Sequence, residues 1–319
     1  MSASGSIFIK SRSKSLKDVK LEVPTENTLT YQSVLQQISK SNHNISVNRL
    51  RLSYLKEGKQ VAIGPSELND VGKKHTFDSV NEWYVKDLGP QISWRLVFFI
   101  EYLGPILIHS LVYLLSLNAT VRDKFHSENV PYNDFFNKFI YRLIMVHYLK
   151  REFETLFIHS FSLETMPLFN LFKNSFHYWI LNGLISLGYF GYGFPFANKT
   201  LYRVYSTLKI SDFRVLTALF GLSEMFNFYI HVALRRWGDE QKRNGVTKRV
   251  PLNSWLFKLL VAPNYTFESW AWIFFTLLFK LNIFSVIFLV VSVVQMYLWA
   301  QKKNKKYGTK RAFLIPFLF

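Results

Sequence analysis

The stretch Val261-Ala-Pro-Asn-Tyr-Thr-Phe-Glu-Ser-Trp-Ala-Trp272 opens a long apolar run near the end of the chain. Pro263 suits the first turn of a helix, so Asn264, Tyr265 and Glu268 are expected at its start. Asn264 and Glu268 are four residues apart and therefore share one helix face. An amide, a phenol and a carboxylate are costly in hydrocarbon unless they meet partners or a ligand. The pattern indicates either a ligand site or an interfacial Tyr beside a helix-capping Asn.

The surrounding chain is apolar and aromatic after a polar start. Its 319 residues are 49% hydrophobic, and the mean hydropathy is positive. This bias predicts several membrane spans. The net charge of +18 could suggest nucleic acid, but basic pairs such as Arg235-Arg236 lie beside apolar segments, which favours the cytosolic membrane face. The absence of cysteine excludes disulfides and thiol chemistry, and residues 1–5 lack the apolar core of a cleaved signal peptide.

Residues 1–86 predict a small α/β domain of the ubiquitin-like β-grasp type. Alternating apolar positions indicate strands, and Thr28 could cap a helix after the second strand. The expected strands are 7–10, 19–23, 50–55, 60–63 and 82–86. Nothing in this domain looks catalytic, so we expect a cytosolic docking or folding module.

Residues 87–319 predict a membrane-embedded domain of about six helical spans, which makes the fold class a multi-pass α-helical membrane protein. The expected spans are 94–117, 139–161, 167–187, 212–234, 265–280 and 283–300. Basic residues at 235–249 and 302–311 place both termini in the cytosol. The segments 118–137 and 188–211 are then lumenal, each with a glycosylation sequon, at Asn118 and Asn198.

Charged side chains within the spans predict one shared site. Glu101 lies deep in the first span, where a functional role is favoured over an interhelical hydrogen bond. Two further spans carry polar residues at helical spacing, namely His147, Lys150, Arg151 and Glu154, and Glu224, Asn227, His231 and Arg235. Lys150 and Glu154 could simply pair with each other. A charged face in a bundle more often lines an aqueous cavity or ligand site.

The residues exclude several chemistries for this site. There is no Gly-x-Gly-x-x-Gly after a strand and no Walker loop. His147, His159 and His231 lack a His-Glu-x-x-His arrangement and have cationic neighbours, so no metal is expected. A basic, aromatic-lined cavity remains, which suits an anionic cofactor or an acyl-CoA head group whose tail lies in lipid.

Three separated motifs carry a family resemblance. Pro263-Asn-Tyr-Thr-Phe-Glu268 resembles the Asn-(Tyr/Phe)-x-x-Glu signature of the membrane-embedded steroid 5α-reductase family. The terminal residues Tyr307, Arg311 and 314–319 resemble the end of the same family. Residues 147–154 and the complete layout resemble most its very-long-chain trans-2-enoyl-CoA reductases. The resemblance covers essentially the whole chain.

The resemblance implies a reaction and a place for it. NADPH would reduce the α,β double bond of a very-long-chain trans-2-enoyl-CoA to a saturated acyl-CoA, the last step of the fatty-acid elongation cycle, which also feeds sphingolipid synthesis. The implied location is the endoplasmic reticulum membrane. The implied partners are the enoyl-CoA substrate, the lipid bilayer and other elongase enzymes, without nucleic acid. The alternative within the family is a steroid or polyprenoid reductase. A non-enzymatic scaffold would have no nucleotide site. A transporter is disfavoured because the polar residues of the spans lie toward one side of the membrane.

The resemblance also implies residue roles. Tyr265 is expected to be the proton donor, Lys150 the nearby cation and Glu101 a partner that orients the donor or the carbonyl. Matching positions assign Asn264, Glu268, Asn227, Tyr307 and Arg311 to the dinucleotide. Arg151, Arg235 and Arg311 suit its phosphates. His231 stands where the steroid enzymes usually have an acidic residue, which leaves its cofactor contact in question.

Overall fold

The computed structural model describes residues 5–23, 30–63, 82–125, 132–161, 163–191, 199–208, 212–246 and 250–316. The chain divides into two compact units. One contains residues 1–94 with 163–169, and the other contains residues 95–162 with 170–319. Each unit has its own cluster of buried hydrophobic side chains.

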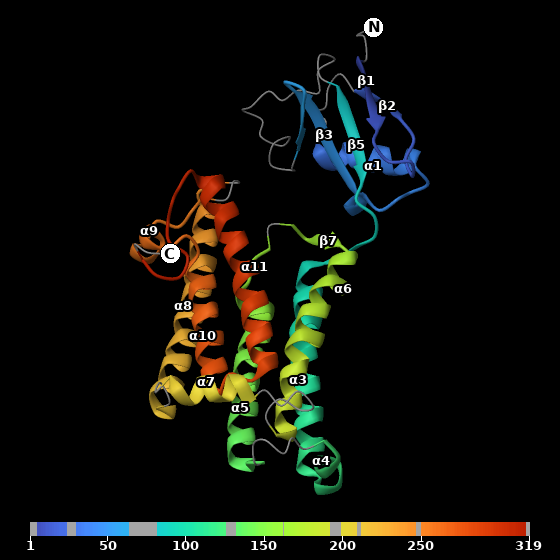
Figure 1. Ribbon diagram of the computed structural model, residues 1–319. Helices are drawn as coiled ribbons and strands as arrows, with labels where there is room; N and C mark the ends of the chain where they lie inside the picture. Colours follow the sequence, from blue (N-terminus) through green and yellow to red (C-terminus); the bar gives the residue numbers. More distant parts are fainter. Residues whose placement is uncertain are drawn as a thin grey trace. The chain divides into compact units, whose positions relative to one another are not determined.

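A five-stranded mixed sheet with one helix packed on it forms the N-terminal unit (Figure 1). The strand order is β2-β1-β5-β3-β4; β1 and β5 are parallel, and the other neighbours are antiparallel. The elements are β1 (Gly5–Ser11), β2 (Val19–Val23), α1 (Tyr31–Ser41), the 3-10 turn η1 (Val47–Arg49), β3 (Leu50–Lys56), β4 (Lys59–Ala62) and β5 (Trp83–Asp87). The expected N-terminal β-sheet domain is confirmed.

Alternation along the strands builds the core of this unit. Ile7 and Ile9 are buried, whereas Phe8 between them is 53% exposed, because successive strand side chains point to opposite faces. Helix α1 begins at Thr30, which forms a reciprocal capping box with Ser33. The cap expected from the sequence, Thr28, lies outside the described residues.

An ion pair closes the sheet where the chain leaves it. Arg49 reaches Asp87 through two bonds, Nη2 to Oδ2 at 2.6 Å and Nε to Oδ1 at 3.0 Å. The backbone N–H of Gly89 also donates to Asp87 Oδ1, at 2.8 Å. The Arg49 guanidinium lowers the pKa of Asp87 to about 2. The pair ties the start of β3 to the end of β5.

A second, two-stranded sheet belongs to the same unit. It pairs β6 (Gln91–Ser93) with β7 (Thr165–Pro167) in antiparallel register. The expectation that Pro167 starts a helix is therefore wrong. Pro167 ends the short strand, and helix α6 begins two residues later, at Phe169. Pro lacks an N–H and is tolerated at such an edge position.

The second unit is helical (Figure 1). In chain order its elements are α3 (Trp94–Leu117), α4 (Ala119–Phe125), α5 (Asp134–Phe153), the π-helical turn η2 (Glu154–Ile158), α6 (Phe169–Ser175), the π-helical η3 (Phe176–Asn182), the 3-10 helix η4 (Gly183–Phe190), α7 (Lys199–Thr207), α8 (Phe213–Arg243), α9 (Trp255–Leu259), α10 (Pro263–Leu278) and α11 (Ile283–Tyr307). Trp94, the first residue of α3, and Phe169 group with the N-terminal unit.

Three helices in the described part of the chain are long and apolar enough to cross a membrane, namely α3, α8 and α11. A helical membrane region is thus confirmed. The other expected spans correspond to α5 with η2, to α6 with η3 and η4, and to α10, which are shorter or irregular.

Helix α8 also differs from expectation, because it continues to Arg243 where a basic loop from residue 235 was predicted. An Arg235–Asp239 ion pair of 2.6 Å, four residues apart, favours this extension.

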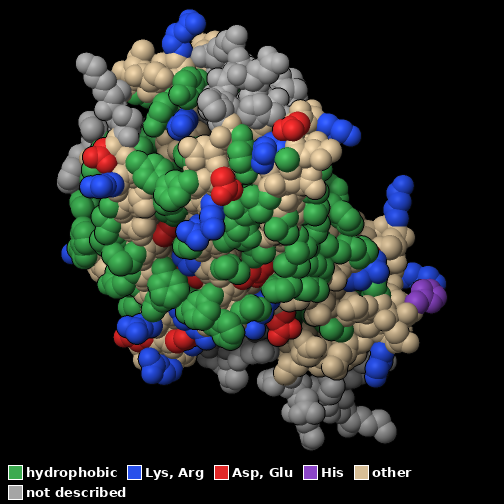
Figure 2. Space-filling view, turned by 90° about the horizontal axis from the view of Figure 1, so that it is seen from below, with side chains coloured by type: hydrophobic (Ala, Val, Ile, Leu, Met, Phe, Trp, Pro, Cys, Tyr) green, Lys and Arg blue, Asp and Glu red, His purple; other side chains and the backbone are tan. Residues whose placement is uncertain are grey.

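Large apolar side chains cover the exposed surface of the helices. On α3, Leu107, Leu111 and Leu114 are 52%, 60% and 63% exposed, and they recur at helical spacing. On α11, Val290 and Val294 are similarly open. Figure 2 shows one end of the molecule, with hydrophobic side chains over much of it and Lys and Arg among and around them. Contiguous apolar surface of this kind is typical of contact with lipid.

A glycine lets α3 approach η3 closely. A Cβ atom on Gly104 would lie 2.1 Å from Nε1 of Trp179. The same indole nitrogen donates to the backbone oxygen of Ile100 at 2.9 Å. Gly104 thus provides the space that the Trp179 ring occupies against α3.

Candidate active site

A row of polar residues on α5 starts the site. His147 is 3% exposed, and Lys150 and Arg151 follow it at three and four residues, which places all three on neighbouring positions of one helix face. Glu154 is fully buried and begins the π-helical turn η2. Such turns inside helices occur often at functional sites.

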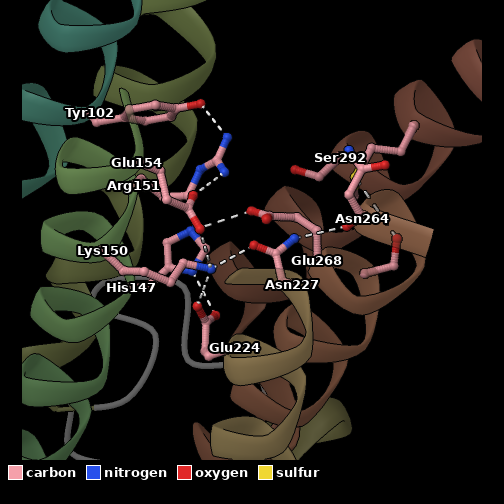
Figure 3. A network of polar contacts seen from close by, with 12 residues as sticks. Tyr102, His147, Lys150, Arg151, Glu154, Glu224, Asn227, Asn264, Glu268 and Ser292 are labelled. Carbon is pink, nitrogen blue, oxygen red and sulfur yellow. Dashed lines mark hydrogen bonds and ion pairs between the residues drawn. The ribbon is translucent and has the colours of Figure 1, made fainter. Parts of the chain in front are cut away.

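Helix α8 presents a matching row to α5 (Figure 3). Glu224 is 6% exposed, and its carboxylate is shared by two side chains of α5. Its Oε1 lies 2.7 Å from Nδ1 of His147, and its Oε2 lies 2.7 Å from Nζ of Lys150. Both oxygens of this buried carboxylate therefore have a charged or hydrogen-bonding neighbour, as a buried carboxylate requires.

Helix α10 joins the same cluster through the residues that opened the sequence analysis. Lys150 Nζ donates to Oδ1 of Asn227 at 2.6 Å, and Asn227 Nδ2 donates to the backbone oxygen of Asn264 at 2.9 Å. Oε1 of Glu268 lies 3.4 Å from Nε2 of His147. Helix α10 thus joins the network through the Glu268 side chain and the backbone oxygen of Asn264 (Figure 3).

A second ion-pair group continues the cluster toward α3. Arg151 Nη1 donates to Oε2 of Glu154 at 2.6 Å, and its Nη2 donates to the hydroxyl oxygen of Tyr102 at 2.7 Å. Nδ1 of His231, from α8, lies 3.0 Å from the same Glu154 oxygen. The polar rows of α5 and α8 therefore meet as one connected network, together with α10 and one residue of α3.

The network does not suit a metal ion. Glu154, His159 and His231 bring one ligand atom each within 4.8 Å of one another. Arg151 Nη1, however, donates to Glu154 and lies 3.3 Å from Nδ1 of His231. A guanidinium in that position competes with a cation for the same oxygen and nitrogen.

Several buried polar atoms of the described residues have no recorded hydrogen bond, and two of those at this site have no ion pair either. They are the hydroxyl of Tyr148, a fully buried side chain on α5, and Oδ1 of Asn264 on α10. The Tyr148 ring packs edge-to-face on His147, with centroids 4.8 Å apart, and lies 6.2 Å from the ring of Tyr102. Unpartnered buried groups are rare and indicate a ligand position or another function.

Tyr265, the proton donor expected from the family motif, has recorded contacts with α11. Its ring lies beneath Nζ of Lys303, at 4.2 Å from the centroid, and 5.9 Å from the ring of Trp299. Both neighbours belong to α11. One residue along a helix turns the side chain by about 100°, so Tyr265 leaves the face that Asn264 uses. A cation that lies over the Tyr265 ring is Lys303.

Glu101 meets an amide from a neighbouring helix. It is 1% exposed, and its Oε1 accepts a hydrogen bond of 2.6 Å from Nδ2 of Asn174 on α6. The next residue, Tyr102, is the one that contacts Arg151. Glu101 thus lies beside the network, and its recorded hydrogen bond is the interhelical contact that was the alternative to a functional role.

The remaining expected cofactor residues lie at the ends of α8 and α11. Arg235 bonds Asp239 and also donates to the backbone oxygen of Ile158 at 3.3 Å. Arg311 donates to the backbone oxygen of Phe257, while its own backbone is held by Asn304. Tyr307 is 37% exposed. Their recorded contacts are with these local groups and not with the α5–α8–α10 network.

Sequence reasoning missed Tyr102 and Tyr148 as site residues. Both are Tyr in apolar helices, where burial of the ring is a sufficient explanation. Tyr148 follows His147 directly, so its place beside the polar row of α5 was the available signal. The hydroxyl without a partner is visible only in the structure.

Comparison with known proteins agrees with the motifs. The family model described as 3-oxo-5-alpha-steroid 4-dehydrogenase matches residues 164–319. A Schizosaccharomyces pombe protein provisionally named as an enoyl reductase is 37% identical, over 98% of this chain and 99% of its own. A Dictyostelium discoideum protein named very-long-chain enoyl-CoA reductase is 33% identical, over 92% and 93%. A Caenorhabditis elegans relative, provisionally given the same name, is 32% identical over 87% and 85%.

These matches define first a class, the membrane oxidoreductases of the steroid 5α-reductase family. Within it the chain belongs to the enoyl-CoA reductases, to which it is similar over nearly its whole length. The resemblance seen in the sequence motifs is thereby confirmed.

Proposed function

We propose that this chain reduces very-long-chain trans-2-enoyl-CoA to saturated acyl-CoA with NADPH. The reaction would complete each fatty-acid elongation cycle and supply chains for sphingolipid synthesis, at the endoplasmic reticulum membrane and beside other elongase enzymes. The observation that carries the proposal is the buried network of α5, α8 and α10, found in a chain similar along its length to enoyl-CoA reductases.

The network and the helix ends supply groups that fit a dinucleotide. The unpartnered Oδ1 of Asn264 is an acceptor for a carboxamide N–H, and Asn227, His231 and Glu268 are its polar neighbours in the network. Phosphates suit Arg235 and Arg311, and Tyr307 lies four residues before Arg311 in the sequence. Arg151, within the network itself, also suits a phosphate. When bound, NADPH supplies the hydride that adds to Cβ of the enoyl thioester.

The chain must stabilise the charge that develops on the thioester oxygen and provide a proton to Cα. We place Tyr148 at the thioester oxygen, because its hydroxyl is buried beside the network and has no partner among the described residues. Tyrosine keeps its proton at neutral pH and can donate it. Tyr265, the donor expected from the family motif, packs toward α11 and is assigned to the wall of the nucleotide site.

The neighbours of Tyr148 would act by position and charge. Arg151 holds the Tyr102 hydroxyl, whose ring lies near that of Tyr148, and so places a cation beside the proposed oxygen site. Lys150 keeps Glu224 and Asn227 in place. Glu101, held by Asn174, would orient the thioester from the α3 side. The net change is one hydride at Cβ and one proton at Cα, which gives the saturated thioester and oxidised cofactor.

The membrane arrangement is part of the proposal. About six spans would place both termini in the cytosol, with residues 118–137 and 188–211 in the lumen, and the order β2-β1-β5-β3-β4 supports a ubiquitin-like β-grasp domain over residues 1–86. Because the chain has no cysteine, single cysteines can test this. In sealed microsomes an impermeant maleimide should label Gln36→Cys and spare Asn118→Cys. Protection of position 36 would refute the orientation.

Substrate choice tests the function itself. Purified protein in detergent should oxidise NADPH when given a long-chain trans-2-enoyl-CoA, and the acyl product should be saturated. A 3-oxo-4-ene steroid or a polyprenoid, tested at the same concentration, should give a much lower rate. A preference for the steroid would replace the enoyl-CoA assignment with the alternative within the same family.

A further inference from the structure

The face of the N-terminal sheet opposite α1 is rich in exposed basic side chains. Helix α1 packs on the face that contains Ile7, Ile9 and Leu52 (Figure 1). On the opposite face Phe8 is 53% exposed, and its sequence neighbour on the same side, Lys10, is exposed as well. We define the outer face by its members Phe8, Lys10, Lys20, Arg51, Tyr84 and Lys86.

The strand register brings these residues together across four strands. Phe8 pairs with Lys20 between β1 and β2, and Lys10 pairs with Tyr84 between β1 and β5. Arg51 pairs with Lys86 between β3 and β5. Directly opposed residues lie about 5 Å apart at Cβ, so the four cations and two rings form one continuous surface.

Two acids belong to this surface: Glu22, which the register places opposite Ser6 on the same face as Lys20, and Glu82. Glu82 lies 3.3 Å from Nζ of Lys10 and 2.5 Å from the hydroxyl of Tyr84. Lys20, Arg51 and Lys86 have no ion pair recorded among the described residues. Like charges on opposed strands, as at Arg51 and Lys86, are destabilising unless an anion compensates them. The outer face therefore favours an anionic partner.

We propose that the outer face docks the N-terminal domain on an anionic lipid surface. Four cations against the two acids Glu22 and Glu82 leave this surface net positive, which attracts acidic headgroups, and the exposed Phe8 ring suits the boundary between headgroups and acyl chains. Residues 88–93 lead from β5 into α3, a candidate membrane span, so the domain belongs to a chain that is itself anchored in a bilayer.

The composition favours lipid over an acidic protein. Lysine is depleted at the centres of protein interfaces, where large apolar and aromatic side chains dominate. Here Lys10 and Lys20 adjoin the Phe8 ring on either side, and Arg51 and Lys86 lie at the other end of the surface. An array of cations around one exposed ring is the composition of a membrane-surface segment.

The absence of cysteine permits a direct test on the full chain. Phe8→Cys is labelled with an apolar, environment-sensitive dye, and the protein is placed as a single copy in nanodiscs of phosphatidylcholine with or without phosphatidylserine. We expect a blue shift of the dye with phosphatidylserine that is lost at about 1 M salt, where charges are screened within about 3 Å. The same dye at Gln36→Cys, on the exposed side of α1, should not shift.

Charge reversal provides the matched comparison. Lys20→Glu with Lys86→Glu should abolish the shift at position 8, whereas Lys14→Glu with Lys17→Glu, which are exposed but outside the outer face, should preserve it. Equal melting temperatures of the two double variants show that both are folded. An equal shift in neutral lipid, a shift that survives Lys20→Glu with Lys86→Glu, or one that requires an added acidic protein would overturn the proposal.

Discussion

Nδ1 of His147 and Oε1 of Glu224 lie 2.7 Å apart, although the two residues are separated by 77 positions in the chain. This contact joins α5 to α8 inside the helical unit. Lys150 occupies the other oxygen of the same carboxylate, so one buried acid organises two side chains of α5. Because Lys150 also bonds Asn227, and Asn227 bonds the backbone of Asn264, the same contacts connect α5 and α8 to α10.

Lys150→Met should destabilise the helical unit. The change leaves the Glu224 carboxylate with only His147 to compensate its buried charge, and breaking a buried pair costs about 3 kcal/mol or more. The double variant Lys150→Met with Glu224→Gln removes the charge as well and should recover much of the loss. Unfolding in detergent measures both. If the double variant is no more stable than the single one, the carboxylate does not depend on Lys150.

Asn264→Ala should weaken NADPH binding without unfolding the protein. Its Oδ1 is buried and unpartnered, so loss of one hydrogen bond to the cofactor should raise the Kd about fivefold, equivalent to about 1 kcal/mol. Ser269→Ala is the control, because Ser269 is buried on the same helix but bonds the backbone of Tyr265. Equal Kd values for Asn264→Ala and Ser269→Ala would remove Asn264 from the nucleotide site.

Stability of the N-terminal unit should fall in acid through Asp87. Its pKa is about 2 in the fold against 3.8 ordinarily, so its contribution is present above pH 4 and is lost as the pH falls toward 2. A shift of this size corresponds to about 2 kcal/mol. Hydrogen exchange of the β3 and β5 peptides should accelerate over that interval. Asp87→Asn should exchange faster at pH 7 and lose most of this acid dependence; an unchanged profile would contradict the ion-pair assignment.

Local patterns predicted much of the fold. Alternation at Ile7, Phe8 and Ile9 gave the correct faces of β1, and the apolar run from Trp94 gave both ends of α3. The predicted ends of helices and strands were wrong where two local sequence signals competed. The basic segment after Arg235 looked like a loop, but pairing with Asp239 extends the helix. Pro167 resembled a helix start, yet pairing with Gln91 makes it the end of a strand.

The charged part of the network was predicted from the sequence, whereas the position of the Tyr148 hydroxyl beside it was not. Helical spacing placed Lys150 with Asn227 and Glu268 on converging faces, because the period of a helix fixes which residues share a side. Which helix a single Tyr meets depends on rotation and packing, which one sequence does not specify. The ring of Tyr265 contacts Trp299 of α11, and the ring of Tyr148 packs on His147 of the network.

Single-turnover oxidation of NADPH by Tyr148→Phe tests the central claim most directly. With saturating NADPH and long-chain enoyl-CoA, the variant keeps the ring but lacks the hydroxyl, and loss of one such donor slows the chemical step by about 10²–10³. We predict this loss for Tyr148→Phe with an unchanged Kd for NADPH, and a much smaller loss for Tyr265→Phe. A wild-type rate for Tyr148→Phe, together with a slow Tyr265→Phe, would contradict the account and return the proton donor to Tyr265.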